Sequence, residues 1–264
     1  MTKTRFYSET RNGVPLLKCS LLTPHHGFAG RQGGVSTLPH LAELNIGDGL
    51  GDSATHVAEN LSRLAAAVDA QPDRIVRAKQ VHGNCVLYVT QSDCGRIDLT
   101  CDGFVTDEPD VVLLVKTADC VPILLCDRKN GVVAALHAGW RGSVARIAAK
   151  GIEAMCEAGA DRRTVTAAIG PCIHSCCYTV GEEVIQTFYD VCREDAEACI
   201  VQNGESGQGK LDLAAWNRRV LLREGIAPDH IAVSDLCTCC HTDRLFSHRG
   251  MQGKRGVMGA VIRL

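Results

Sequence analysis

The sequence lacks the long apolar segments that mark a membrane protein. No run of the chain approaches the roughly 18 apolar residues that a membrane-spanning helix needs, and the opening MTKTRFYSET is polar where an export signal is apolar. An excess of charge is missing too, because 28 Lys and Arg residues nearly balance 30 Asp and Glu residues and leave a net charge of −2. This balance gives no electrostatic reason to expect nucleic acid or an anionic membrane as a partner. We therefore expect neither partner, and a cytoplasmic location.

Internal repeats, low-complexity tracts and recognisable linkers are also missing from the 264 residues. A chain of this length can bury a substantial core. Its hydrophobic content of 45% and charged content of 22% are those of an ordinary globular protein. We predict a single domain over residues 1–264, present as a monomer or a weak homo-oligomer.

Cysteine, in contrast, is abundant. The chain contains fifteen cysteines, an odd number, scattered through a sequence without an export signal. In a reducing cytoplasm such thiols stay free or bind metal, so we expect no disulfide framework.

Strand-like and helix-like segments are mixed along the chain. Asp52 or Ser53 could cap a helix over about 53–70. Helical periodicity returns at 143–159, 181–193 and 212–224, and a Gly-rich loop occupies 27–39. Strand-like runs occupy 74–79, 85–90, 103–106, 111–116, 121–126, 132–137, 164–170, 231–235 and 257–264. Because several strands follow one another directly, we predict an α+β fold of mixed α/β layers rather than an alternating βαβ fold.

The most informative segment is KTADCVPILLCDRKNGVVAALHAGWRG at 116–142, which reads as a β-hairpin. With a four-residue loop from Asp127 to Asn130, Cys120 would lie directly opposite His137, at a Cβ separation of about 4.5–5.5 Å. His82, in QVHG, precedes another strand-like run. Two imidazoles and a thiolate are a three-ligand zinc set with an open fourth position, which is typical of catalytic zinc. The alternatives are a surface His82, a Cys120 buried for packing and a His137 bonded to backbone.

A resemblance supports this metal set. RQGGVST, NIGDGLGD, QVHG, DGFVT, TADCVPILL, HAGWRG, AIGPCI, CCYTVGEEV and LFSHR occur in the order and spacing of one family. It is known as the laccase-domain, multi-copper polyphenol oxidoreductase or purine nucleoside phosphorylase family. The resemblance implies a layered fold similar to the cytotoxic-necrotizing-factor cysteine hydrolases, and Zn²⁺ held by His82, Cys120 and His137. It further implies phosphorolysis of adenosine, inosine, guanosine and methylthioadenosine, together with adenosine deamination, so that purine nucleosides and phosphate are the expected partners.

Other residues of these motifs are candidates for substrate or phosphate binding. Arg141 follows a strand and precedes a helix, and Arg31 lies in the Gly-rich loop; either guanidinium could clamp phosphate, or could belong to an ordinary turn or loop. Trp140 could stack on a purine or pack in the core. Asn45 could form a polar wall or a structural turn. Asp119 could orient a ligand or accept backbone N–H groups.

Two cysteine clusters stand apart from these candidates. They comprise Cys176 and Cys177 in one segment, and Cys237, Cys239 and Cys240 followed by His241 in another. Neither shows the two CxxC pairs of a zinc ribbon. Their cysteines either pack near the site or bind an additional soft metal such as copper, and the sequence leaves both open.

Rival functions remain. In a cysteine hydrolase, such as a peptidoglycan-precursor editing enzyme, Cys120 would be a thiolate nucleophile paired with a histidine. A copper laccase that uses Cu²⁺ would need HxH pairs; the chain has none, and its single HH, His25–His26, is expected in a loop.

Overall fold

The computed structural model describes residues 5–202 and 207–264, which form two six-stranded sheets and one three-stranded sheet. The first sheet has the order β1-β2-β3-β15-β7-β4, comprising Phe6–Arg11, Val14–Cys19, His25–Ala29, Met258–Arg263, Val112–Thr117 and Ile75–Val76. The second has the order β14-β10-β8-β9-β6-β5, comprising Ile231–Val233, Thr166–Ile169, Val121–Asp127, Val132–Ala138, Gly103–Thr106 and Val86–Tyr88. The small third sheet has the order β11-β13-β12, comprising Thr179–Val180, Gly209–Leu211 and Ile200–Gln202.

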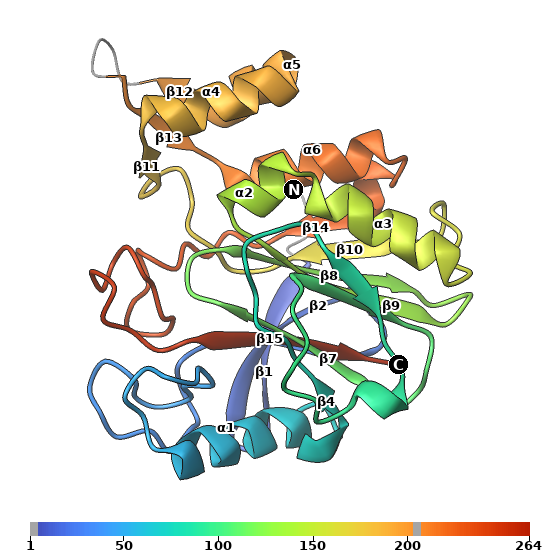
Figure 1. Cartoon of the computed structure of the whole chain (residues 1–264), viewed down its shortest axis with the longest axis vertical. Helices are drawn as coiled ribbons and strands as arrows, with labels where there is room; N and C mark the ends of the chain where they lie inside the picture. The colour runs from blue at the N-terminus through green and yellow to red at the C-terminus, as the bar shows by residue number, and fades with distance from the viewer. Residues whose placement is uncertain (1–4, 203–206) are drawn as a thin grey trace.

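Six α-helices lie outside these sheets in the part of the chain that the structure describes. They are α1 (Ala54–Ala66), α2 (Trp140–Val144), α3 (Ile147–Glu157), α4 (Glu182–Val191), α5 (Arg193–Cys199) and α6 (Leu213–Arg223). Single 3₁₀ turns occupy Pro72–Arg74, Gln91–Asp93 and Pro228–His230. In Figure 1, α1 lies below the first sheet, α2, α3 and α6 lie above the second, and α4 and α5 stand with the small sheet at one end. None of these helices is long and apolar enough to cross a membrane.

The two large sheets pack face to face because their central strands, such as β7, β8 and β9, are apolar on both sides. In β8, Leu124 and Cys126 face the first sheet, while Ile123 and Leu125 face the helices above. The core between the sheets also receives Leu113 from β7. Strands buried on both faces are expected to be continuously apolar. The result is a four-layer arrangement of helix, sheet, sheet and helices, so mixed α/β layers are confirmed.

The helix predicted over 53–70 is present as α1. Ser53 caps it by accepting a hydrogen bond from the backbone N–H of Thr55 at 3.2 Å. Val57, Leu61 and Leu64 of α1 are buried against the first sheet. This apolar stripe explains why a helix of ordinary propensity forms and docks here.

Three elements differ from the sequence predictions. The hairpin of β1 and β2 was not predicted, although its turn, Asn12-Gly13, has positive φ at both residues (49° and 80°), as a tight hairpin turn requires. His25 and His26 lie in β3 rather than in a loop. The predicted helix at 143–159 is divided, because Arg146 adopts a left-handed φ of 58° between α2 and α3.

The predicted register of the β8–β9 hairpin is wrong by two residues. Pro122, not Cys120, lies opposite His137, because Asp127 pairs with Val132 and the loop begins one residue later than expected. A two-residue shift preserves the face on which a side chain lies, whereas a one-residue shift would reverse it. Cys120 therefore remains on the same face as His137, just before β8 begins.

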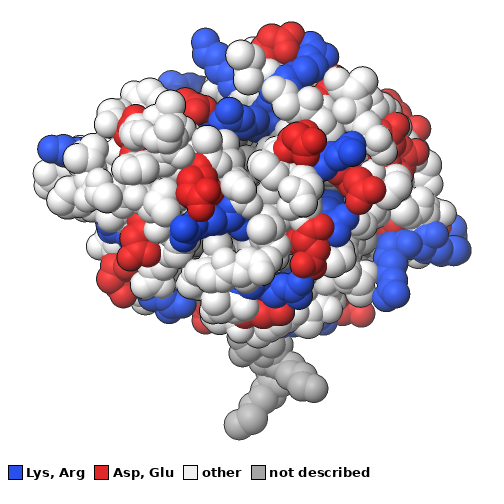
Figure 2. All heavy atoms as spheres, turned by 90° about the horizontal axis from the view of Figure 1, so that it is seen from below, with Lys and Arg blue, Asp and Glu red and all other residues white. Residues whose placement is uncertain are grey.

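Charged side chains of both signs are interspersed over the face of the molecule shown in Figure 2, without a large area of one sign. This distribution agrees with the net charge of −2.

Candidate active site

The candidate site lies at one rim of the layer between the two large sheets. β6 begins directly after Asp102, β8 begins directly after Cys120, and β9 ends one residue past His137. At the same rim of the first sheet, β7 ends at Thr117, which pairs with Met258 at the start of β15. Strand ends from both sheets thus converge here, although they are distant in the sequence.

His82, Cys120 and His137, which we call the trio, meet at this rim. One ligand atom from each lies within 4.8 Å of the other two. The imidazole rings of His82 and His137 stand edge to face, with centroids 4.9 Å apart. His137 is buried, Cys120 is partly exposed and His82 is exposed. The three residues that the sequence grouped are therefore neighbours in space.

A buried carboxylate, Asp102, fixes both histidines of the trio. Its Oδ1 lies 2.9 Å from Nδ1 of His137 and accepts the backbone N–H of His82 at 2.9 Å. Its Oδ2 accepts the backbone N–H groups of Val81 and Gly83 at 3.2 and 2.8 Å. Asp102 holds His82 in a left-handed conformation (φ 60°) and leaves Nε2 of His137 as the ring nitrogen free to face Cys120.

The charges of this group are mutually dependent. Burial by itself raises the pKa of the Cys120 thiol, but His137 and His82 outweigh that effect and lower it to about 6. Burial opposes protonation of His137, but Cys120 and Asp102 raise the pKa of its imidazole to about 9. A thiolate facing an imidazolium backed by a carboxylate is accordingly favoured near neutral pH, and a metal ion that binds there would displace the proton on Nε2 of His137. Such a thiolate can act either as a metal ligand or as a nucleophile.

Gly139, which follows β9, leaves room for the trio. A Cβ added at this position would lie 2.9 Å from Cδ2 of His82 and 3.2 Å from Sγ of Cys120. Its φ of −71° is open to any residue, so space rather than backbone freedom explains the glycine in HAGWRG.

A cavity of about 280 Å³ opens in front of the trio. Besides the trio it is lined by the turn at Gly47, Asp48 and Leu50, by Thr117, Ala118, Arg255 and Val257, and by Lys79, Gln80 and Lys116. A neighbouring pocket shares Asp48, Lys79 and Lys116 and extends the opening to Arg77 and Ile97. Three cations and one carboxylate therefore line the cavity, which makes it suited to an anionic group.

Arg255 is the most distinctive of these cations. Its Nε is buried without a hydrogen-bond partner among the described residues. Burial lowers the pKa of its guanidinium, against the opposing charges of Asp119 and Cys120. Burial similarly lowers the pKa of Lys116. A buried donor normally finds a partner, so the unpartnered Nε of the partly buried Arg255 would suit a ligand that supplies negative charge.

Arg31 was predicted to bind phosphate, a prediction that remains untested, and its guanidinium is engaged with the protein. Its guanidinium donates to the carbonyls of Ala42, Thr242 and Pro39 at 2.7, 2.7 and 2.9 Å and lies over the ring of Phe246. It does not line the cavity of the trio. In this structure Arg31 holds the Gly-rich loop together.

Arg141 and Trp140 also lie outside the lining of this cavity. Both belong to α2, and the Arg141 guanidinium lies 4.2 Å from the centre of the Trp140 ring. Trp140 packs against the core under the helices, and Arg141 is exposed. Their predicted contacts with purine and phosphate remain untested.

Asn45 and Asp119 act on backbone near the cavity. Asn45 is fully buried; its Oδ1 accepts the N–H groups of Gly47 and Val257 at 3.0 and 3.1 Å, so it shapes the wall from behind. Asp119 accepts the hydroxyl of Thr238 at 2.5 Å and the backbone N–H of Arg249 at 2.6 Å. These contacts organise the surrounding chain, and the predicted role of Asn45 in substrate binding remains untested.

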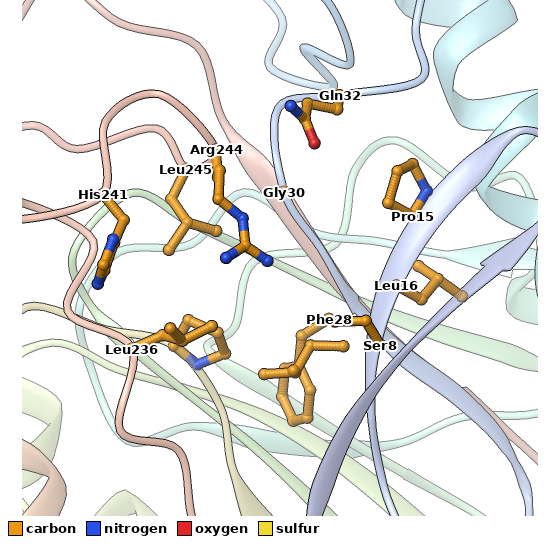
Figure 3. Close-up of a pocket in the computed structure, with 12 residues that line it drawn as sticks. Ser8, Pro15, Leu16, Phe28, Gly30, Gln32, Leu236, His241, Arg244 and Leu245 are labelled. Atoms are coloured by element: carbon orange, nitrogen blue, oxygen red, sulfur yellow. The ribbon is translucent and has the colours of Figure 1, made fainter.

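A second, smaller pocket, shown in Figure 3, shares no lining residue with the cavity of the trio. It lies between Ser8, Pro15 and Phe28 of the first sheet and the chain around Leu236 and Leu245. His241, which the sequence grouped with the nearby cysteines, lines this pocket.

Sequence reasoning missed Asp102, Lys116 and Arg255. Asp102 opens DGFVT, one of the recognised motifs, and this was the available signal. Nothing in the local pattern of Lys116 or Arg255 distinguishes them from other cations, because their burial depends on the packing of distant loops.

Comparison with known proteins places the chain in a family. A family model described as multi-copper polyphenol oxidoreductase laccase matches residues 25–264. The chain belongs to this family. Its recognition from the motifs is confirmed.

Related proteins carry names from nucleoside metabolism. The purine nucleoside phosphorylase of Deinococcus radiodurans is 40% identical over 255 residues, which cover 97% of this chain and 95% of that protein. The adenosine deaminase RL5 of an unknown prokaryotic organism is 34% identical over 230 residues, covering 84% of this chain and 87% of that protein. Both names denote nucleoside chemistry, whereas the description of the family model denotes polyphenol oxidation.

Solved structures of the family share the fold. The YlmD protein of Geobacillus stearothermophilus superimposes with a TM-score of 0.86 at 36% identity, over 99% of each chain. The hypothetical protein YfiH of Bacillus licheniformis gives a TM-score of 0.92 at 31% identity, over 99% of this chain and 100% of that one.

Proposed function

We propose that this protein is a metal-dependent purine nucleoside phosphorylase that also deaminates adenosine. The names of its relatives support this activity. The main support for the proposal is that the His–Cys–His trio and a cavity lined by cations lie together at one rim. The first suits a metal and the second suits phosphate.

The trio fits a zinc ion by the chemistry of its donors. Two imidazoles and a thiolate are ligands that zinc prefers, and three protein ligands leave a position open for reactants. The carboxylate of Asp102 bonded to Nδ1 of His137 at 2.9 Å is the partner that a metal-binding histidine usually has. Bound there, the ion would supply Lewis-acid chemistry toward an oxygen nucleophile. A Cu²⁺ ion is the alternative occupant.

The chain's own residues would bind and orient the reactants. Arg255 and Lys116 would hold phosphate in the cavity, with the free Nε of Arg255 donating to one of its oxygens. Gln80 is fixed by hydrogen bonds to the backbone of Lys116 at 2.7 and 2.8 Å, which keeps this wall rigid. Phosphorolysis then forms a bond between a phosphate oxygen and the anomeric carbon while the glycosidic bond to the base breaks. Deamination adds water at the amino-bearing ring carbon and releases ammonia.

The test is phosphate-dependent release of hypoxanthine from inosine, with ammonia release from adenosine measured in parallel. Cys120→Ala is expected to abolish both activities and to lower metal content. The matched control is Cys94→Ala, a partly buried cysteine outside the trio, which should retain both. Full activity of Cys120→Ala would contradict the proposal.

A cysteine hydrolase is the second candidate, and one observation favours it. Cys120, His137 and Asp102 form a chain in which a thiol of lowered pKa faces an imidazole held by a carboxylate. The resemblance in fold to cysteine hydrolases of the cytotoxic-necrotizing-factor type would accord with it. Complete inactivation by one equivalent of a thiol alkylator, with activity unaffected by a chelator, would favour this candidate over the metal enzyme.

A cytoplasmic location belongs to the same proposal. All fifteen cysteines fall within the described residues and none forms a disulfide. Free thiols in this number persist in a reducing compartment.

A further inference from the structure

Four cysteines outside the trio converge on one point. Sγ atoms of Cys176, Cys177, Cys237 and Cys240, which we call the four-cysteine cluster, all lie within 4.8 Å of one another. The Sγ of Cys240 lies 3.4 Å from that of Cys177 and 3.7 Å from that of Cys176. The cluster joins two segments that are more than sixty residues apart.

These separations suit a tetrahedral thiolate site. Four sulfurs that each lie about 2.3 Å from a zinc ion stand about 3.8 Å apart at the corners of a regular tetrahedron. Cys237 and Cys240 also have the spacing of one CxxC pair, and the adjacent Cys176 and Cys177 take the place of the second pair. The structure thus completes a set of ligands that the sequence spacing alone does not reveal.

Backbone contacts hold the two segments ready for a metal. Cys237 and Cys172 form a bridge of β type, and the backbone N–H of Thr238 donates to the carbonyl of Cys172 at 3.0 Å. The backbone N–H of His174 points at the Cys237 sulfur at 3.4 Å. An N–H group directed at a sulfur stabilises its thiolate form, the form that binds metal. Little ordering would therefore remain to oppose binding.

Ordinary packing and disulfide formation explain the cluster less well. Cys176 and Cys240 are exposed, whereas thiols kept for packing are usually buried. A disulfide joins two sulfurs and gives no reason for four to converge.

We propose that the four-cysteine cluster is a second, structural metal site that binds a soft cation, Zn²⁺ or Cu⁺, through four thiolates. Four protein ligands leave no open position, so this ion would hold the two segments together rather than take part in catalysis. The hydroxyl of Thr238 donates to Asp119, the neighbour of Cys120, at 2.5 Å. The ion would accordingly steady the chain that carries the thiolate of the trio.

Metal stoichiometry tests the proposal on the full chain, purified with a thiol reductant and loaded with zinc or, in a separate sample, with Cu⁺. We expect about two ions per chain, falling to about one in Cys176→Ser/Cys240→Ser and also in His82→Ala. Cys239→Ser is the matched control: Cys239 lies in the same segment but outside the cluster, and this variant should keep both ions. Comparing the metal content of the zinc-loaded and Cu⁺-loaded samples shows which of the two ions the cluster binds.

A spectrum and a mass measurement on the unaltered chain keep the test valid if a variant misfolds. Cobalt titration should give the intense charge-transfer and visible bands of a tetrathiolate site, separate from those of a site with two imidazoles. In the zinc-loaded protein, the exposed Cys176 and Cys240 should resist alkylation until a chelator is added. A zinc content that Cys176→Ser/Cys240→Ser leaves unchanged, immediate alkylation of both residues, or a disulfide found within the cluster under reductant would each overturn the proposal, whereas an empty trio beside an occupied cluster would contradict only the proposed function.

Discussion

Asp102→Asn tests how the protein fixes its trio. In the native chain both carboxylate oxygens accept two hydrogen bonds each, from His82 and His137 on one side and from Val81 and Gly83 on the other. An asparagine side chain of the same shape has only one oxygen. If that oxygen faces the histidines, the amide NH₂ group lies against the backbone N–H donors of Val81 and Gly83. In the reverse orientation the NH₂ group lies against Nδ1 of His137.

The expected cost follows from those contacts. Hydrogen bonds to a charged group contribute roughly 1.5–3 kcal/mol each, so the loss of two should lower the free energy of unfolding by about 3–6 kcal/mol. In the reverse orientation, Nδ1 of the imidazole becomes an acceptor and its proton moves to Nε2, where it blocks the nitrogen that faces Cys120. Loss of such a carboxylate partner typically lowers metal affinity by about 10–100-fold.

Urea denaturation and competitive metal titration measure the two effects separately. Asp127→Asn is a matched control, because Asp127 is equally buried and accepts hydrogen bonds from Thr164 and the backbone of Asp161, at the far end of β8. It should lose comparable stability with unchanged metal affinity. If Asp102→Asn binds metal as tightly as the native chain, the assigned role of Asp102 is wrong.

Three further predictions concern the cavity and the core. Gly139→Ala should lower metal affinity and phosphorolysis at least about tenfold, because its methyl group intrudes on the trio; crystallography or metal titration would reveal the displacement. Arg255→Gln should raise the KM for phosphate about tenfold with little loss of stability, whereas Arg31→Gln should lower the free energy of unfolding by about 2 kcal/mol with that KM unchanged. Burial lowers the pKa of His26 to about 4 from its ordinary value of 6.5. Between these two pH values, His26 is protonated in the unfolded chain but not in the folded one. Stability should therefore fall by about 2 kcal/mol from pH 7 to pH 5 in urea titrations, and His26→Gln should remove this part of the loss.

Each of these has a contrary outcome. Native metal affinity in the Gly139 variant would show that the trio can move aside without penalty. If Arg31→Gln raised the KM for phosphate and Arg255→Gln lowered only the stability, phosphate would bind at the Gly-rich loop. An equal loss of stability at pH 5 in native protein and the His26 variant would assign that loss to other groups.

The fold was predictable from the sequence where apolar pattern alone determines an element. The strands β6, β8 and β9 were found as short, continuous apolar runs, and the helices α1, α4 and α6 were found because their buried residues recur with a helical period. β1 and β2 were missed because their alternation is weak, as the half-exposed pattern of FYSETR illustrates. The break between α2 and α3 was missed because it depends on a left-handed Arg146, which no composition rule requires.

The candidate site divides in the same way. The trio could be grouped from residue chemistry, since few side chains make good metal ligands. The structure brings its three residues together although the predicted register was wrong by two residues. The cationic wall could not be predicted, because Arg255 and Lys116 are ordinary in sequence and acquire their character only when loops from both sheets enclose them. Arg31 illustrates the converse, since a loop arginine that suggests an anion site is used to satisfy three carbonyls.

At this rim, one sheet supports the reactive trio and the other sheet supports part of the cavity wall. The trio is anchored to strand ends of the second sheet through Asp102, whereas the wall formed by Thr117, Arg255 and Val257 belongs to the first sheet and the loop before β15. Substitutions in that wall can therefore change which molecule is admitted while the reactive group keeps its support. An engineer seeking altered selectivity would begin with the turn at 47–50 and the segment before β15, and would leave the opposite side intact.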